Sequence, residues 1–70
     1  MIEIFKTNIA EKHWAMAVIN QLEKEFPQLR MNIDLHDCDK VLRVEGSCIA
    51  CNEIINLVSD CGFHCSLLEG

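Results

Sequence analysis

Residues 29–44 read LRMNIDLHDCDKVLRV, and this stretch decides the fold. Its first seven residues alternate between apolar and polar side chains, which is the period of a strand with one buried face. The apolar positions are Leu29, Met31, Ile33 and Leu35. The polar residues 36–39 predict a turn, and residues 41–44 predict the returning strand. The middle of the chain is therefore expected to form an antiparallel hairpin.

The segment before the hairpin predicts one strand and one helix. Residues 2–7 predict a short strand, because the apolar Ile2 and Ile4 alternate with the charged Glu3. Residues 10–26 predict a helix, with Asn8 as its N-cap and Pro27 closing it. Its apolar positions recur at helical spacing: Ala15, Val18, Ile19, Leu22 and Phe26.

The segment after the hairpin repeats this pattern in reverse order. Gly46 and Ser47 interrupt the strand, and residues 51–61 predict a second helix that ends at Gly62. Residues 63–67 alternate again and predict a last strand. The order strand, helix, strand, strand, helix, strand predicts an α+β fold, the ferredoxin-like βαββαβ sandwich. In that fold a four-stranded antiparallel sheet carries both helices on one face.

Composition narrows the classes of protein that this chain can represent. Its 70 residues are expected to form a single domain, 1–70. Eleven acidic residues against six basic ones give a net charge of −5, which disfavours binding to nucleic acid. No apolar run approaches the roughly 20 residues that a bilayer requires, and no secretory signal opens the chain. The five cysteines are then expected to be reduced thiols, which predicts a cytoplasmic location.

The chain resembles the heavy-metal-associated domain of copper chaperones and metal-transporting ATPases. The resemblance covers almost the whole length, in its element order, its size and the helix–glycine–aromatic passage LVSDCGF at residues 57–63. It implies a domain that binds a soft metal ion through a Met-x-Cys-x-x-Cys loop after the first strand. Residues 6–13 read KTNIAEKH at that place and contain no cysteine, so the family's copper site is not carried over to this loop.

A displaced Cys-x-x-Cys is the candidate metal site. Cys48 and Cys51 lie three residues apart where the second helix is expected to begin. A helix N-terminus stabilises thiolates, and two thiolates suit Cu(I), whereas Zn²⁺ needs further ligands. The topology predicts that this pair lies at the end of the sheet opposite residues 6–13. The alternative is packing, because Cys51 continues the apolar stripe of the helix and a buried cysteine behaves as a small hydrophobe.

The remaining cysteines are weaker candidates. Cys61 and Cys65 continue apolar patterns and are expected to face the core. Cys38 lies in an acidic turn and is expected to be exposed, where it and His36 offer at most a minor metal contact.

The uncovered face of the sheet is the candidate interaction surface. Alternation is expected to send Phe5, Val41 and Leu68 outward onto this face, beside charged residues. Such a face predicts a homodimer or an unknown protein partner. No enzyme motif is present in the sequence, so the leading expectation is a small non-enzymatic binding module that takes Cu(I) or Zn²⁺ at Cys48 and Cys51. The alternatives are an interaction or structural domain without metal, and a thiol redox protein.

Overall fold

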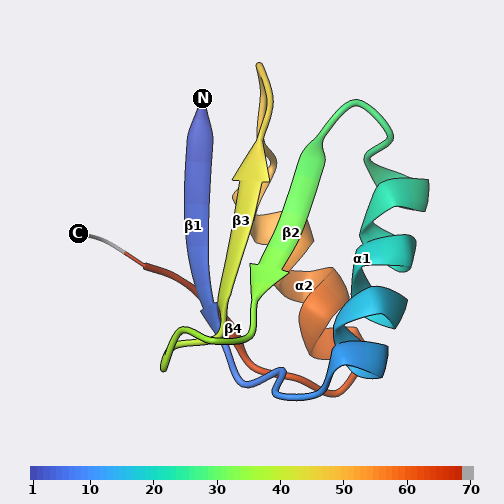
Figure 1. Cartoon of the computed structure of the whole chain (residues 1–70). Helices are drawn as coiled ribbons and strands as arrows, with labels where there is room; N and C mark the ends of the chain where they lie inside the picture. Colours follow the sequence, from blue (N-terminus) through green and yellow to red (C-terminus); the bar gives the residue numbers. More distant parts are fainter. Residues whose placement is uncertain (69–70) are drawn as a thin grey trace.

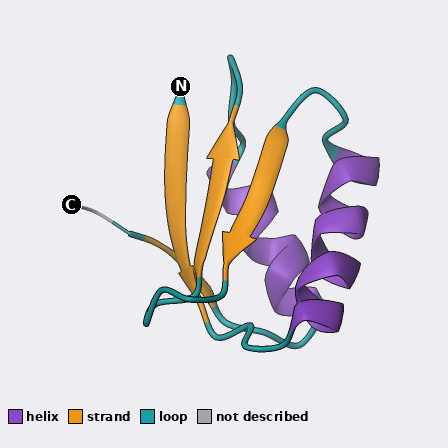
Figure 2. Ribbon diagram, viewed as in Figure 1, coloured by secondary structure: helices purple, strands orange, loops and turns teal. Residues whose placement is uncertain are grey.

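The computed structural model describes residues 1–68 of the chain (Figure 1). The elements follow the expected order: β1 Ile2–Thr7, α1 Lys12–Glu25, β2 Arg30–Asp34, β3 Val41–Glu45, α2 Cys51–Asp60 and β4 Cys65–Leu67. The prediction of an α+β fold with a four-stranded antiparallel sheet and two helices is confirmed. Figure 2 shows both helices on the same side of the sheet. Within the described residues, no helix has the length and apolar character needed to cross a bilayer.

The strands are arranged in the order β2-β3-β1-β4. Helix α1 connects β1 to β2, and yet β3 lies between these two strands in the sheet. Helix α2 connects β3 to β4, and β1 lies between them. The two strand–helix–strand units are therefore interleaved, and the two central strands come from different halves of the chain.

The core lies between the sheet and the two helices. Helix α1 contributes Ala15, Val18 and Leu22 to it, and helix α2 contributes Ile54 and Val58. The other buried apolar residues come from the strands and loops: Phe5, Ile9, Leu29, Leu42 and Val44. The predicted stripe of α1 is confirmed, with Ile19 and Phe26 packed at its margin. One face of each helix thus covers one face of the sheet.

In β1, the alternate residues that point to the core are the ones that the sequence pattern placed on the opposite face. Phe5 is fully buried, whereas Ile2 and Ile4 are 47% and 37% exposed. The register explains the difference, because Phe5 pairs with Leu42 of β3, whose side chain points to the core, and Ile4 pairs with Arg43. Directly paired residues share a face of the sheet. The prediction that Phe5 points outward is wrong, and Ile2 and Ile4 occupy the uncovered face instead.

The approach to α1 also differs from the expectation. The helix begins at Lys12 after the N-cap residue Glu11, whose side chain makes no capping hydrogen bond. The carboxamide oxygen of Asn8 accepts a hydrogen bond from the backbone N–H of His64 at 2.8 Å. Asn8 therefore joins the loop before α1 to the loop before β4, and the prediction that it is the helix N-cap is wrong.

Candidate functional site

The Cys48–Cys51 segment connects β3 to α2. It lies at the end of the sheet opposite the loop between β1 and α1, as the topology predicts (Figure 1). Gly46 opens the segment, and a Cβ atom there would collide with the side chain of Leu29, so a glycine fits this close approach. The chain then passes the exposed Cys48 and enters the helix at Cys51.

The two cysteines stand in different environments. Cys48 precedes the N-cap residue Ala50, so it lies outside the helix, while Cys51 is the first helical residue. Cys51 is half-buried and packs against the core cluster. Burial raises the pKa of the Cys51 thiol, and the carboxylate of Glu3 raises it further, although a hydrogen bond from its own backbone N–H acts in the other direction. The net effect of these contacts is a raised pKa, which favours the protonated thiol at Cys51.

In the described part of the chain, no third His, Cys, Asp or Glu side chain joins this pair in a cluster that could hold one ion. Among residues 1–68, the group of three or more His, Cys, Asp or Glu side chains close enough to hold one ion is Asp37, Cys38 and Asp39. The pair alone provides two sulfur ligands, which suits a two-coordinate soft ion better than tetrahedral Zn²⁺.

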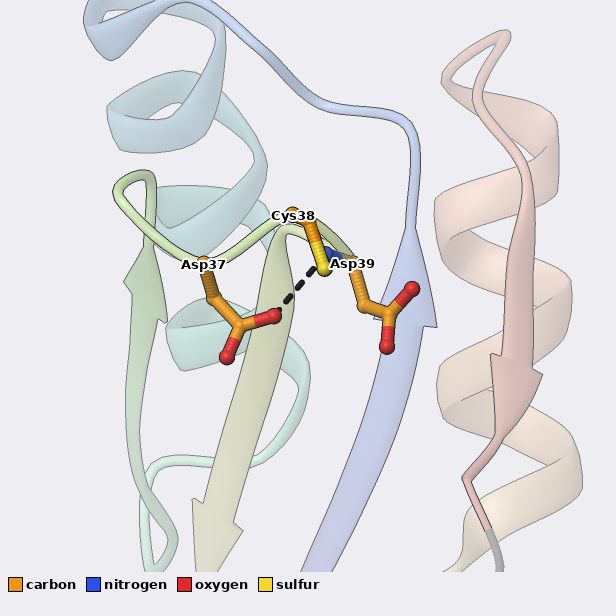
Figure 3. Close-up of side chains that lie close together, drawn as sticks. All are labelled: Asp37, Cys38 and Asp39. Atoms are coloured by element: carbon orange, nitrogen blue, oxygen red, sulfur yellow. Dashed lines mark hydrogen bonds between the residues drawn. The ribbon is translucent and has the colours of Figure 1, made fainter.

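The second cluster lies in the turn between β2 and β3 (Figure 3). Ligand atoms of Asp37, Cys38 and Asp39 lie within 4.8 Å of one another. A carboxylate oxygen of Asp37 accepts a hydrogen bond from the backbone N–H of Asp39 at 2.8 Å, and Asp39 lies 3.7 Å from the Lys6 ammonium. These contacts shape the turn, as Asp commonly does. The sequence offered Cys38 with His36, whereas the structure gathers Cys38 with its two acidic neighbours.

Thr7 fixes this turn to the end of β1. Its backbone N–H donates to the carbonyl of Asp39 at 3.0 Å, and its hydroxyl donates to the carbonyl of Lys40 at 2.6 Å. The same hydroxyl oxygen accepts a hydrogen bond from the backbone N–H of Ile9 at 3.2 Å. Thr7 is only 5% exposed, so water has little access to these groups.

Replacing Thr7 by valine is expected to lower the free energy of unfolding by about 1–3 kcal/mol, because it keeps the shape and leaves two backbone groups without their partner. Urea denaturation followed by circular dichroism measures the loss. Thr7→Ser is the matched control, since it keeps the hydroxyl and should retain more of the stability. A valine variant as stable as the serine variant would contradict the role given to the hydroxyl.

The two cysteines expected to face the core, Cys61 and Cys65, differ in their exposure to solvent. Cys61 is exposed, so the prediction that it faces the core is wrong. The backbone at Cys61 still has helical geometry, and its N–H donates to the carbonyl of Leu57 at 3.1 Å, but the side chain at this end of α2 is exposed to solvent. Cys65 is half-buried on β4, and burial raises the pKa of its thiol to about 11. Cys38 is exposed as expected.

The uncovered face of the sheet contains a hollow of about 580 Å³. Its apolar lining comes from Ile4, Val41 and Leu68, together with Ile33 of the edge strand β2, and Ile4 and Leu68 are 37% and 39% exposed. Its polar lining comes from Asn32, Asp34, Asp37 and Arg43. Of the residues expected outward on this face, Val41 and Leu68 are in place. Ile4 takes the position that the sequence assigned to Phe5.

Comparison with known proteins finds no matching protein-family model, no matching curated protein and no matching solved structure.

Proposed function

We propose that this chain is a non-enzymatic binding module with the ferredoxin-like sandwich of the heavy-metal-associated type, and that it binds a protein partner through the uncovered face of its sheet. The interleaved strand order supports this fold, because each strand–helix–strand unit is split by a strand of the other. Five free thiols fit a reducing compartment, so we place the protein in the cytoplasm.

The single observation that carries the proposal is the apolar hollow on the uncovered face. Ile4 of β1 and Leu68 after β4 line this hollow and are 37% and 39% exposed, and Ile2 on the same face of β1 is 47% exposed. Exposed apolar side chains that gather within a polar rim are typical of a surface that another protein covers. The hollow is about 580 Å³ in volume, enough to accept one or two large side chains of a partner.

The rim indicates the chemistry of that partner. Asp34 and Asp37 line the hollow, with Arg43 as its basic member, and the whole chain carries a net charge of −5. A partner with an apolar side chain beside a lysine or arginine complements this surface, because opposite charges at a rim steer association and fix the register.

A photo-crosslinking residue at position 4 tests this proposal in the cells that make the protein. It is expected to capture one defined protein, and a crosslinker at the exposed position 21 of α1 is expected not to capture it. With the purified partner, Ile4→Lys should weaken binding by at least about tenfold, while Gln21→Lys leaves it unchanged. Equal capture at both positions, or equal binding of both variants, contradicts a site on the uncovered face.

Binding of Cu(I) by Cys48 and Cys51 is the second candidate function. The favouring observation is that Cys48 is exposed and Cys51 is only half-buried, so an ion can approach both from the same loop. Burial of Cys51 raises the pKa of its thiol, but a soft ion competes for sulfur far better than a proton does. The same raised pKa weighs against Cys51 as the attacking thiolate of a redox protein.

Competition between reduced protein and a chromophoric Cu(I) chelator measures this activity. One ion is expected per chain, and binding is expected to be lost in Cys48→Ser and in Cys51→Ser. Cys38→Ser and Cys61→Ser are the matched controls, since both remove an exposed thiol elsewhere. Binding that survives in the Cys48→Ser/Cys51→Ser double variant would rule out this site.

A further inference from the structure

Strand β2 forms one edge of the sheet, and it contains no proline, no lysine and no inward-pointing charge. Natural edge strands are kept from pairing by proline, by lysine, by inward-pointing charge or by being very short. Strand β4 at the other edge has three residues, whereas β2 has five, RMNID. The core-side positions of β2 are Met31 and Ile33, both apolar. Strand β2 therefore presents an edge on which another strand can pair.

An apolar groove of about 500 Å³ runs beside this edge, between α1 and β2. Its apolar lining includes Met16 and Ile19 from the helix and Met31 and Ile33 from the strand. Met16 is 57% exposed, although it stands on the side of α1 that borders the sheet edge. If the added strand belongs to a domain of the same fold, the helix of that domain lies alongside α1. Pairing at the edge of β2 then also covers the groove between α1 and β2.

The charges of β2 identify the added strand. We propose that a second copy of this chain pairs with β2 in antiparallel orientation, about a two-fold axis at Asn32. In this register Arg30 faces Asp34 of the second copy, and Asp34 faces Arg30 of the second copy. Met31 faces Ile33 of the second copy in the same way. The strand is therefore complementary to itself in both charge and apolar character, as a two-fold interface requires.

The faces of the sheet agree with this register. Arg30, Asn32 and Asp34 pair with Glu45, Arg43 and Val41 of β3, so they lie on the uncovered face, and Met31 and Ile33 lie on the face beneath the helices. About a two-fold axis at Asn32, residue 30 pairs with residue 34 of the second copy, and residue 31 pairs with residue 33. The two members of each pair are an even number of positions apart along the strand, so both lie on the same face of the sheet. The dimer thus has one continuous eight-stranded sheet, with two copies of α1 adjacent across the axis.

Charge reversal tests this arrangement without touching the core. Arg30 and Asp34 are exposed, and each single reversal sets like charges opposite one another twice in the dimer. Arg30→Asp alone and Asp34→Arg alone should each raise the dissociation constant of the dimer at least about tenfold. An equimolar mixture of the two variants should form a dimer with one copy of each, because every pair across the axis is then opposite in charge.

Sedimentation velocity and native mass spectrometry on the full chain give the readout. Glu53→Arg on the exposed side of α2 changes net charge as Asp34→Arg does, and it should leave the dimer intact. A chain that stays monomeric at the highest attainable concentration overturns the proposal. So does a mixture of the two single variants that remains monomeric. A dimer that is lost in Ile4→Lys and retained in both charge variants would place self-association on the uncovered face instead.

Discussion

Phe5→Ala is expected to lower the free energy of unfolding by about 3–5 kcal/mol, the usual cost of removing a fully buried aromatic ring. Phe5 lies in a central strand, between Leu42 of β3 and Leu67 of β4 in the register, and its side chain is 0% exposed. A domain of this length holds on the order of 5–10 kcal/mol in total. The variant should therefore be close to unfolded at 37 °C.

Ile4→Ala is the matched control, because it shortens the adjacent side chain of the same strand on the uncovered face. Its cost is expected to stay below about 1 kcal/mol, since Ile4 is already 37% exposed. Urea denaturation followed by circular dichroism compares the two variants. The reverse order of stabilities would show that β1 packs with Ile2 and Ile4 against the helices.

The second large effect is expected in the reactivity of the thiols. Burial raises the pKa of Cys65 to about 11 from an ordinary value of 9.0, so its thiolate is about 100-fold rarer at pH 8. A more basic thiolate is also a better nucleophile, so the alkylation rate falls by less than the thiolate population does. Alkylation of Cys65 by iodoacetamide should therefore be at least about tenfold slower in the folded protein than in urea.

Mass spectrometry of peptides after timed alkylation measures each cysteine separately. The exposed Cys38, Cys48 and Cys61 should react before Cys51 and Cys65, which are half-buried. In denaturant the five thiols should react at similar rates, and this is the control. Rapid alkylation of Cys65 in the native state at pH 8 would contradict its position beneath the helices.

The raised pKa of Cys65 also predicts how stability changes with pH. The unfolded chain releases the Cys65 proton near pH 9, whereas the folded protein holds it to about pH 11. The unfolded state then binds fewer protons across this window, so the free energy of unfolding falls as pH rises through it. Chemical denaturation at pH 8 and pH 10.5 measures the fall, which should be smaller in Cys65→Ala.

Most of the fold could be predicted because several segments have a single consistent pattern. In β2, Met31 and Ile33 alternate with polar residues, so only one face could be buried, and the prediction is confirmed. In β1 the sequence Ile2, Glu3, Ile4, Phe5 has apolar residues on both faces of the strand. Local alternation favours burial of Ile2 and Ile4, whereas Phe5 is the residue that is buried. The choice is made by the pairing of Phe5 with Leu42, which lies far away in the sequence.

Only part of the candidate site could be predicted from the sequence, for a similar reason. The position of Cys48 and Cys51 at the far end of the sheet follows from element order alone, and it is confirmed. The periodicity of α2 includes Cys61, but periodicity alone does not show how far along the helix the core extends, and the Cys61 side chain is exposed. The hollow on the uncovered face combines residues of β1, β2 and β3 with the residue after β4, so it becomes visible only when the strands are assembled.

The interleaved strand order means that neither half of this chain contains a pair of neighbouring strands. Strands β1 and β2 of the first half both need β3, and β3 and β4 of the second half both need β1. Strands β2 and β3 pair across a short turn, whereas β1 joins β3 and β4 through contacts between distant residues, and these contacts slow the folding of so short a chain. A single cut in the turn at residues 36–39 would yield two fragments that are each unstructured alone. Mixed together, they would fold as one, so the two halves are obligate complements.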